Sequence, residues 1–396
     1  MVRKNEIFGI AVVAILCLLL IGFSQKDTPN YHNRPARYQQ LLDLEETFRI
    51  SNNSATVPTP SIQDVISQQR NIILQELEDY KFPVGDNLED YTLVTGGQPL
   101  RTVIITTWRS GSTFLGDVVN AVPGNYYHYE PLLDYGIMQI RGAPHSESAL
   151  RTLKSLLNCD YTNLHKYLEF GMDHVYLFTH NTRLWNQCEV YQQYCWNATF
   201  LNDFCKLFPF QSMKTVRLRL WLAETLLNDE ELNVKVVLLV RDPRGTIQSR
   251  KHRDWCPGEP DCDQPNNLCA DMVSDYSAAI QLKKRYPERF RAMRYEDLSL
   301  NPYDTIRDLF DFLGLYFHNN VVRFLDSHTR VNVGGVSSTF RDSRSAPFHW
   351  KMDLNYTEVQ FIEENCDEAM KLWGYVRSKN SSTLRDLNPL TSFEIN

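Results

Sequence analysis

The chain has 396 residues, of which 43% are hydrophobic and 12% aromatic. This composition fits one large globular domain, or two smaller ones, with appendages. The formal net charge of −7 argues against a protein that binds nucleic acid non-specifically. It is compatible with a local anion site, because a bound phosphate responds mainly to charges within about 10 Å.

The first predicted element is a membrane-spanning helix at residues 7–23. The segment Ile7–Phe23 is apolar and uncharged, and it is long enough to cross a thin bilayer. Arg3 and Lys4 precede it, so the positive-inside rule predicts a type II anchor with residues 1–6 in the cytoplasm and the rest in the lumen. The alternative is a cleaved signal peptide, but no small-x-small cleavage site follows Phe23.

The cysteines and glycosylation sequons agree with a lumenal location. An even number of cysteines follows the anchor, which indicates disulfides in an oxidising compartment without fixing their pairing. Zinc is the competing interpretation, and the absence of C-x-x-C spacing argues against it. The cysteines outside the anchor are Cys159, Cys188, Cys195, Cys205, Cys256, Cys262, Cys269 and Cys366. The N-x-S/T sequons begin at Asn52, Asn197, Asn355 and Asn380.

Residues 24–91 are predicted to form a lumenal stem, because they begin as a polar segment with scattered proline and asparagine. Within it, apolar residues at helical spacing predict a helix near residues 61–77. This helix either packs on the following domain, which we favour, or associates with a second copy to form a homodimer. The catalytic domain is assigned to residues 92–380 and a C-terminal tail to residues 381–396.

Alternating apolar strands and helices from residue 92 predict an α/β fold with a parallel sheet flanked by helices. Ligands then bind at the carboxyl ends of the strands. The predicted strands are 101–108, 211–218 and 234–240. The predicted helices include 112–121, 218–227, 244–253, 274–284 and 303–313. The insert at residues 143–209 carries four cysteines and is predicted to form a subdomain beside the sheet, as a substrate wall.

A first anion site is predicted where strand 101–108 meets helix 112–121. Gly111 allows close backbone approach to a ligand, and the helix N-terminus offers unpaired N–H groups. The loop residues are Arg109, Ser110, Gly111, Ser112 and Thr113. They add a permanent cation and hydroxyl donors. An ordinary turn capped by Ser112 is the alternative, but such a turn does not explain the arginine.

A second anion site is predicted after strand 234–240. Asp242 is a plausible helix cap and Pro243 a plausible first helical residue, so Arg241 and Ser249 can converge beyond the strand end. The alternative is a structural Arg–Asp pair. Two separate phosphate-binding sites indicate a nucleotide with a 5′ group and a distinct 3′-phosphate, because the phosphates of a nucleoside triphosphate lie in one row.

Here the sequence resembles the Golgi carbohydrate sulfotransferases that act on the 6-hydroxyl of galactose, N-acetylgalactosamine or N-acetylglucosamine. "TTWRSGSTFLGDVV" is similar to their 5′-phosphosulfate loop and "LLVRDPRGTIQSR" to their 3′-phosphate motif. The resemblance implies a P-loop-like fold that uses 3′-phosphoadenosine 5′-phosphosulfate (PAPS). It places Arg109, Ser110, Gly111, Ser112, Thr113 and Phe114 at the 5′ end, and Arg241 and Ser249 at the 3′-phosphate.

Three further stretches are similar to the family: "YYHYEPL", "MRYEDLSLNPYDTIRDLFDFLGL" and "STFRDSRSAPFHWKMDL". The last places Lys351 at the cofactor, where the family more usually has arginine, and a lysine cannot make the same planar, two-bond contact. The "RYEDL" residues favour a structural ion-pair network, with Arg294, Glu296 and Asp297 near the cofactor. The basic run 250–253 is expected to lie mostly on the surface.

The catalytic candidates are Arg109 and Glu130. Arg109 would neutralise charge that grows on the 5′-phosphate. Glu130 follows the first loop by one helix and a turn and matches the family's catalytic glutamate, so it is the predicted base. His128 is its competitor, with an ordinary pKa better suited to a base near neutral pH. No acidic pair is evident that would hold a metal, and none is expected.

The predicted function is sulfuryl transfer from PAPS to a glycan hydroxyl by a type II enzyme of the Golgi membrane. The expected partners are a glycan or glycoprotein acceptor and the membrane, with no nucleic acid. One alternative is an enzyme that sulfates protein tyrosine, which would need a groove for acidic peptides. The other is a non-catalytic lumenal protein that binds nucleotides or glycans. Lys214 and Arg217 are candidates to face an acidic glycan, although a structural role is equally compatible with the sequence.

Overall fold

A computed structural model describes residues 60–395, except 83–86 and 335–337. The predicted anchor, the first part of the stem and Asn52 lie outside the described residues. The described chain from Pro60 onward forms one compact unit. None of the helices in this part of the chain is long and apolar enough to span a membrane.

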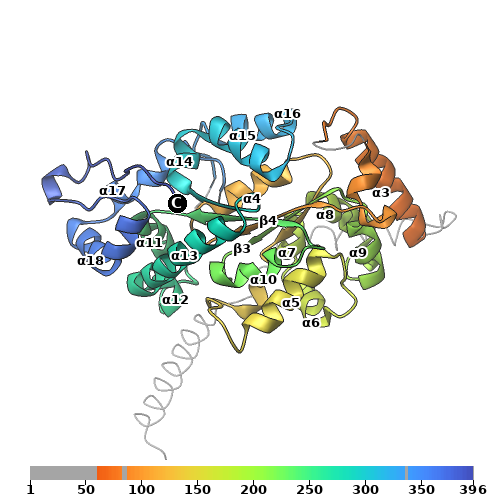
Figure 1. The fold of residues 1–396 in the computed structure, drawn as a ribbon, viewed down its shortest axis with the longest axis horizontal. Coiled ribbons are helices and arrows are strands. Elements are labelled where there is room, and N and C mark those ends of the chain that lie inside the picture. Colours follow the sequence, from red (N-terminus) through yellow and green to blue (C-terminus); the bar gives the residue numbers. More distant parts are fainter. Residues whose placement is uncertain (1–59, 83–86, 335–337, 396) are drawn as a thin grey trace, which may run out of the picture. The chain divides into compact units, whose positions relative to one another are not determined.

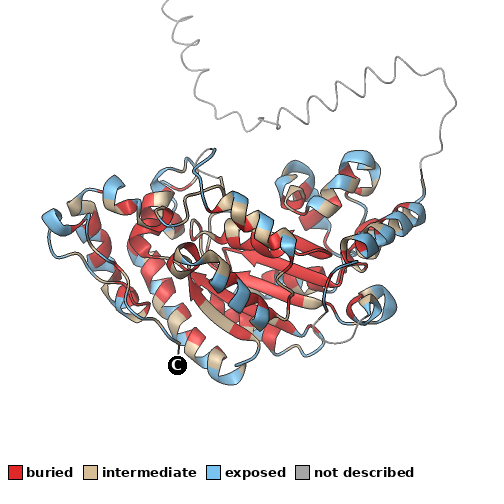
Figure 2. Ribbon diagram, turned by 90° about the horizontal axis from the view of Figure 1, so that it is seen from above, coloured by how far each residue is buried: buried red, intermediate tan, exposed pale blue. Residues whose placement is uncertain are grey.

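The centre of this unit is a parallel five-stranded sheet with the order β2-β3-β1-β4-β5. Strands β1, β3 and β4 confirm the three predicted strands, although β1 ends at Ile105 and β3 at Thr215. The sheet core is buried (Figure 2). Two strands lie outside the predicted set, namely β2, with its polar and aromatic sequence NYYHY, and the edge strand β5. The strands are β1 Leu100–Ile105, β2 Asn125–Tyr129, β3 Phe210–Thr215, β4 Val234–Val240 and β5 Phe290–Arg294.

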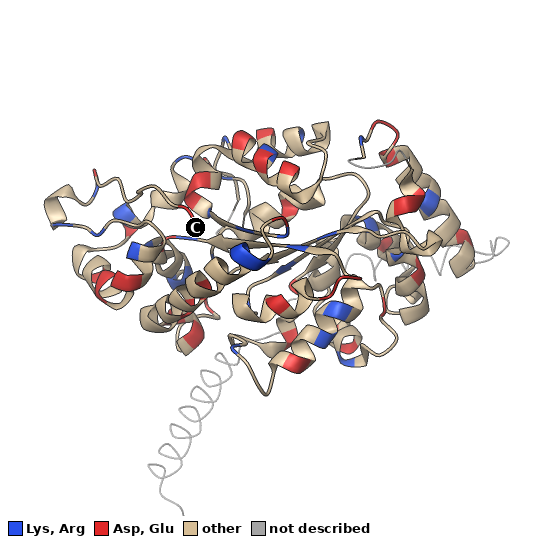
Figure 3. Ribbon diagram, in the orientation of Figure 1, with Lys and Arg blue, Asp and Glu red and all other residues tan. Residues whose placement is uncertain are grey.

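Helices cover both faces of the sheet, as the alternating pattern predicts. Figure 1 shows α4, α14, α15 and α16 on one side, with α5, α10 and α13 on the other. Basic and acidic residues are interspersed over both layers (Figure 3). The α-helices are α3 Ile62–Glu76, α4 Ser112–Asn120, α5 Ser146–Leu157, α6 His165–Asp173, α7 Tyr176–Thr179, α8 Thr182–Val190, α9 Ala198–Cys205, α10 Glu224–Leu227, α11 Pro243–Lys251, α12 Pro260–Asp263, α13 Pro265–Arg285, α14 Tyr295–Leu300, α15 Pro302–Leu313, α16 Asn319–His328, α17 Trp350–Asp353 and α18 Tyr356–Leu372.

Short 3-10 helices connect several of these elements: η1 Leu88–Tyr91, η2 Leu93–Thr95, η3 Leu133–Tyr135, η4 Gln192–Tyr194, η5 Leu220–Ala223, η6 Ala346–Phe348 and η7 Ser381–Thr383. Local sequence explains the main helix boundaries. In α11, Asp242 caps the N-terminus by accepting from Arg244 N–H at 2.9 Å, and Pro243 is the first residue. In α18, Asn355 and Glu358 form a reciprocal capping box.

Helix α3, in the predicted stem, packs on the compact unit. The Glu76 carboxylate accepts hydrogen bonds from Gly124 N–H at 3.0 Å and from Arg183 Nε at 2.9 Å. Val65 and Ile73 are buried in the core. The helix therefore adopts the packed arrangement favoured from its sequence.

The insert at residues 143–209 forms helices α5 to α9, and its helix α7 packs against β2. Two disulfides lie within the insert, and the predicted pairing of the cysteines after residue 23 is confirmed. The bonds in the described chain are Cys159–Cys205, Cys188–Cys195, Cys256–Cys262 and Cys269–Cys366.

Candidate active site

The loop between β1 and α4 is shaped for close contact with a ligand. Gly111 has φ 89°, and a Cβ atom there would lie 2.2 Å from the Tyr295 ring, so no side chain fits. Helix α4 begins at Ser112 without a side-chain cap on its first N–H groups. These N–H groups and the positive end of the helix dipole can therefore bind an anion.

Ser110 supports this loop from behind. Its side chain is fully buried. The hydroxyl lies 2.5 Å from Thr106 Oγ1 and donates to Thr107 O at 2.9 Å. The structure thus places Ser110 as a brace for the loop backbone.

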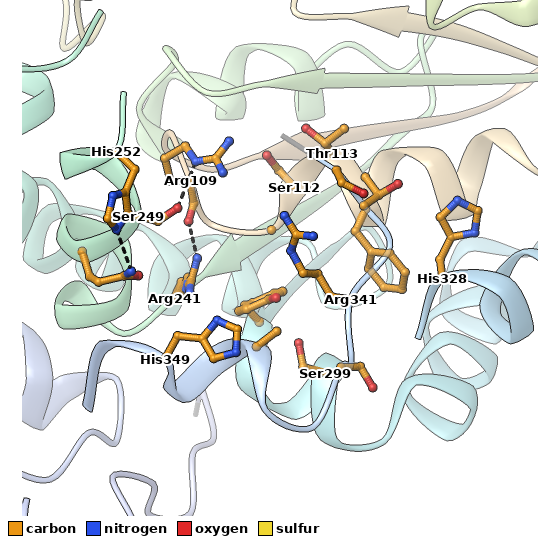
Figure 4. Close-up of a pocket in the computed structure, with 18 residues that line it drawn as sticks. Arg109, Ser112, Thr113, Arg241, Ser249, His252, Ser299, His328, Arg341 and His349 are labelled. Carbon is orange, nitrogen blue, oxygen red and sulfur yellow. Dashed lines mark hydrogen bonds between the residues drawn. The ribbon is translucent and has the colours of Figure 1, made fainter. Parts of the chain in front are cut away.

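The loop between β4 and α11 joins the first loop directly. Arg241 Nη1 donates to the Arg109 carbonyl at 2.8 Å, and Arg109 Nε donates to Ser249 Oγ at 3.1 Å. The two predicted anion sites are therefore adjacent parts of one pocket (Figure 4).

This pocket has a volume of about 210 Å³, and none of its described lining residues is a carboxylate. Arginines, histidines, hydroxyls and the N-terminus of α4 surround it. The lining residues include Arg109, Gly111, Ser112, Thr113, Phe114, Arg241, Ser249, His252, Tyr295, Ser299, His328, Arg341 and His349. Burial and the neighbouring charges of Arg253 and Arg241 lower the pKa of Arg109 to about 10, so Arg109 stays cationic at neutral pH. The chemistry of this lining fits a phosphorylated ligand.

Several lining residues lay outside the sequence-predicted set, notably Arg341 and the three histidines. Arg341 belongs to the stretch "STFRDSR". The similarity of this stretch to the sulfotransferase family could have identified Arg341 from sequence. Lys351, in contrast, is not among the lining residues. Its ammonium donates to Leu387 O at 2.5 Å and lies 4.9 Å from the centre of the Phe348 ring.

Glu130 lies at the carboxyl end of β2, two strands away from β1. Its backbone has φ 46°, and its N–H donates to the Lys214 carbonyl at 2.9 Å. The Glu130 carboxylate is only 8% exposed and pairs with Lys214 Nζ at 2.5 Å and Arg217 Nη1 at 3.0 Å. Lys214 and Arg217 are thus buried partners of Glu130, which supports a structural role for both.

His128, the competing base, is buried beside Tyr126, with ring centres 5.0 Å apart. Burial lowers the pKa of His128 to about 3, so its imidazole is neutral. No described residue hydrogen-bonds to its Nε2. This environment favours Glu130 over His128 as the group that receives a proton.

The "RYEDL" residues form a buried network that supports the second loop, as the sequence favours. Glu296 Oε1 accepts from Asp242 N–H at 3.0 Å, and Glu296 Oε2 accepts from Tyr375 O–H at 2.8 Å. Arg294 pairs with Asp297 at 2.8 Å. Glu296 thereby fixes the backbone next to Arg241.

The expectation for the run 250–253 is wrong for Arg250, which is buried. It donates to Trp108 O at 3.1 Å, to Thr107 Oγ1 at 2.6 Å and to Cys262 O at 2.7 Å. Arg250 therefore stabilises the first anion loop from α11. The rest of the run fits the expectation, since Lys251 and His252 are exposed. Arg250 alone turns inward, toward the loop that follows β1.

Residues 99–374 match the family described as "Sulfotransferase domain", and the chain belongs to this family. It is 26% identical over 334 residues to carbohydrate sulfotransferase 5 of Mus musculus, covering 74% of this chain and 85% of that one. It is 26% identical over 337 residues to carbohydrate sulfotransferase 1 of Danio rerio, covering 72% and 80%. The resemblance to the carbohydrate sulfotransferases is confirmed.

Among solved structures, the sulfotransferase domain of the Synechococcus PCC 7002 olefin synthase is 18% identical, with a TM-score of 0.36. The alignment covers 67% of this chain and 94% of that chain.

Proposed function

We propose that this protein transfers a sulfuryl group from PAPS to a glycan hydroxyl and releases adenosine 3′,5′-bisphosphate (PAP). The acceptor is the 6-hydroxyl of N-acetylglucosamine, galactose or N-acetylgalactosamine. The family match and the carbohydrate sulfotransferase relatives support this activity. The observation that carries it is the anion pocket that joins Arg109, Arg241 and Ser249 at the ends of β1 and β4.

PAPS fits the chemistry of this pocket. When bound, it supplies a sulfuryl group whose transfer leaves negative charge on the 5′-phosphate. Arg109, Ser112, Thr113 and the N-terminus of α4 would hold the 5′ end and stabilise that charge. Arg241 and Ser249 would hold the 3′-phosphate, and Arg341 adds a third cation. Lys351 would contribute only indirectly, by fixing the segment next to the pocket.

Glu130 is the proposed base for the acceptor hydroxyl. It would accept the hydroxyl proton while the hydroxyl oxygen bonds to sulfur. The carboxylate pairs with two cations and lies at the same sheet edge as the pocket. General-base catalysis of this kind contributes about 10²–10⁴-fold in rate.

We further propose that the enzyme works in the Golgi lumen on a type II anchor at residues 7–23. The four disulfides of the described chain support an oxidising compartment. The acceptor is a glycan or a glycoprotein.

The test uses the purified full-length protein, radiolabelled PAPS and a panel of desulfated glycans. Wild type should label a sugar O6, and Glu130→Gln should reduce kcat by at least about 100-fold with unchanged PAP affinity. Glu147→Gln is the matched control, because Glu147 is 89% exposed on α5, and it should keep wild-type activity.

Other outcomes would contradict the proposal in distinct ways. Transfer to tyrosine peptides but to no glycan would assign the enzyme to a peptide acceptor. Tight PAP binding without transfer to any acceptor would indicate a non-catalytic binding protein. Failure to bind PAP would overturn the assignment of the pocket.

A further inference from the structure

The Glu130 carboxylate carries one cation on each oxygen. Lys214 Nζ lies 2.5 Å from Oε1, and Arg217 Nη1 lies 3.0 Å from Oε2. Within the described chain no other side chain hydrogen-bonds to this carboxylate. The arrangement is buried, with Lys214 and Arg217 side chains only 2% and 3% exposed.

Burial by itself works against a carboxylate base, because desolvation favours the protonated, neutral form. A protonated Glu130 could not take a proton from a hydroxyl. Opposite charges within hydrogen-bond distance reverse this preference. The two cations on Glu130 therefore offset the cost of burying its negative charge.

Both cations remain charged at the pH of any assay. Burial is the largest single influence on Lys214 and lowers its pKa, but the charge and hydrogen bond of Glu130, with Tyr129 and Asp117, together raise the pKa above its ordinary value. Burial also lowers the pKa of Arg217, against the opposing charge of Glu130. A guanidinium nevertheless stays protonated in proteins.

The two cations are also fixed in position. Arg217 Nε donates to the Gly136 carbonyl at 2.7 Å, and its guanidinium lies 5.6 Å from the Trp108 ring centre. Lys214 Nζ lies 4.1 Å from the centre of the Tyr129 ring. Neither side chain can swing away without losing a second contact.

Other charged or titratable groups face this cluster from the elements packed around it. They are Asp117 of α4, Tyr127 and Tyr129 of β2, Asp134 of η3, Tyr176 of α7 and His180 before α8. His180 stacks on Tyr129 at 3.8 Å between ring centres and lies 3.6 Å from Asp117. Among the described residues, Lys214 and Arg217 are the cations that hydrogen-bond to Glu130.

We propose that Lys214 and Arg217 are positioning residues that keep Glu130 ionised and thereby set the lowest pH at which it can act as a base. This inference rests on the proposed role of Glu130. In the step concerned, the acceptor O–H bond breaks and the proton moves to a Glu130 oxygen. The electron pair stays on the hydroxyl oxygen, which forms the bond to sulfur.

The test is the pH dependence of kcat for Lys214→Met, measured with full-length protein from pH 5 to 9. Removing one cation should move the acid limb of the profile upward by about 1–3 units. The variant should therefore lose kcat progressively as the pH falls toward 5 and recover most of it at high pH. Lys214→Arg keeps the charge and should return the limb toward its wild-type position.

The matched control is Lys154→Met. It breaks the ion pair between Lys154 of α5 and Asp229, whose Nζ–Oδ2 distance is 2.9 Å. Its profile should match wild type. In the Glu130→Gln background, Lys214→Met should cause no further pH-dependent loss, because its effect acts through Glu130. PAP affinity should stay within about twofold in every variant.

Two results overturn the inference while the proposed function stands. One is a Lys214→Met profile whose acid limb does not move and whose kcat is reduced equally at all pH values. That result would indicate that Lys214 contacts the sulfuryl group instead. The other is a loss of kcat on Lys214→Met that is the same in the wild-type background and in the Glu130→Gln background. If Lys214→Met does not bind PAP, Arg217→Gln serves instead, and an unmoved limb there also overturns the inference. A fully active Glu130→Gln would instead refute the base assignment itself.

Discussion

Arg109 and Glu130 share an unusual backbone conformation. Among the described residues, the non-glycine residues with positive φ are Arg109, Glu130, Cys159 and Asn233. This region costs a residue with a Cβ on the order of 1 kcal/mol, so surrounding contacts must hold it. Arg241 binds the Arg109 carbonyl, and the Lys214 carbonyl accepts the Glu130 N–H. The two catalytic candidates are thus held in strained conformations by the residues that also define their chemistry.

A prediction for a single residue concerns Arg341, which lines the pocket from a segment without regular structure. Arg341→Gln should weaken PAP binding by about 10- to 100-fold, because a charge-assisted hydrogen bond contributes about 1.5–3 kcal/mol. Arg344→Gln is the control, since Arg344 is exposed and does not line the pocket. Calorimetric titration with PAP measures both. Equal affinities for the two variants would remove Arg341 from the binding site.

At the scale of elements, the turn from β4 into α11 depends on buried acids. Asp242 caps the helix and pairs with Arg244 at 2.7 Å, and Arg244 reaches Glu363 of α18 at 2.7 Å. Glu296 holds the Asp242 backbone from the other side. Burial, with the nearby Asp242 charge, raises the pKa of Glu296 to about 7. The loop that carries Arg241 is therefore tied to a group that titrates near neutral pH.

The pH dependence of stability follows from this shift. Because the pKa of Glu296 is raised on folding, the native state binds more protons than the unfolded state between about pH 4.5 and 7. This stabilisation is complete below about pH 4.5 and is lost as the pH rises through about 7. Thermal unfolding from pH 5 to 8 should show wild type losing stability relative to Glu296→Gln. Parallel curves for the two proteins would contradict the shift.

Sequence reasoning found the elements whose signals are local. The glycine and hydroxyls before α4, and the Asp-Pro pair before α11, identify both anion loops from a few neighbouring residues. The pairing of Glu130 with Lys214 depends on the register of β2 with β3, where Tyr129 lies opposite Lys214. Strand β2 carries no aliphatic residue, so neither the strand nor this register was predictable.

Local sequence patterns also could not predict which residues from distant segments line or support the pocket. Arg341 reaches the pocket from a segment more than 200 residues after Arg109, by chain folding alone. Arg250 looks like part of a basic surface run, but helix packing turns it under Trp108. The family resemblance correctly indicated the quoted stretch around Arg341 without identifying the residue.

At the scale of the whole molecule, disulfides join segments that are far apart in sequence. Cys269–Cys366 spans 97 residues and links α13 to α18, whereas Cys188–Cys195 spans 7. The closed loop between Cys269 and Cys366 contains Arg294, Glu296 and Arg341. This bond therefore closes the part of the chain that supplies one wall of the pocket.

Removing these bonds should cost unequal amounts of stability. In the loop-entropy account, Cys269→Ser with Cys366→Ser should lower the free energy of unfolding by about 4–5 kcal/mol, against about 2 kcal/mol for Cys188→Ser with Cys195→Ser. Denaturant unfolding of the two double variants measures the difference. A larger loss for the short loop would show that local packing outweighs loop length here.

The strand order sets the distance between the ends of β1 and β2. Glu130 and Arg109 follow β2 and β1, which are separated only by β3. Hydrogen-bonded strands lie about 4.8 Å apart, so the two strand ends are about 10 Å apart whatever covers the sheet. The backbone hydrogen bonds of β3 thus fix the distance between the proposed base and the proposed phosphate loop. Helices on either face of the sheet can vary without changing that distance.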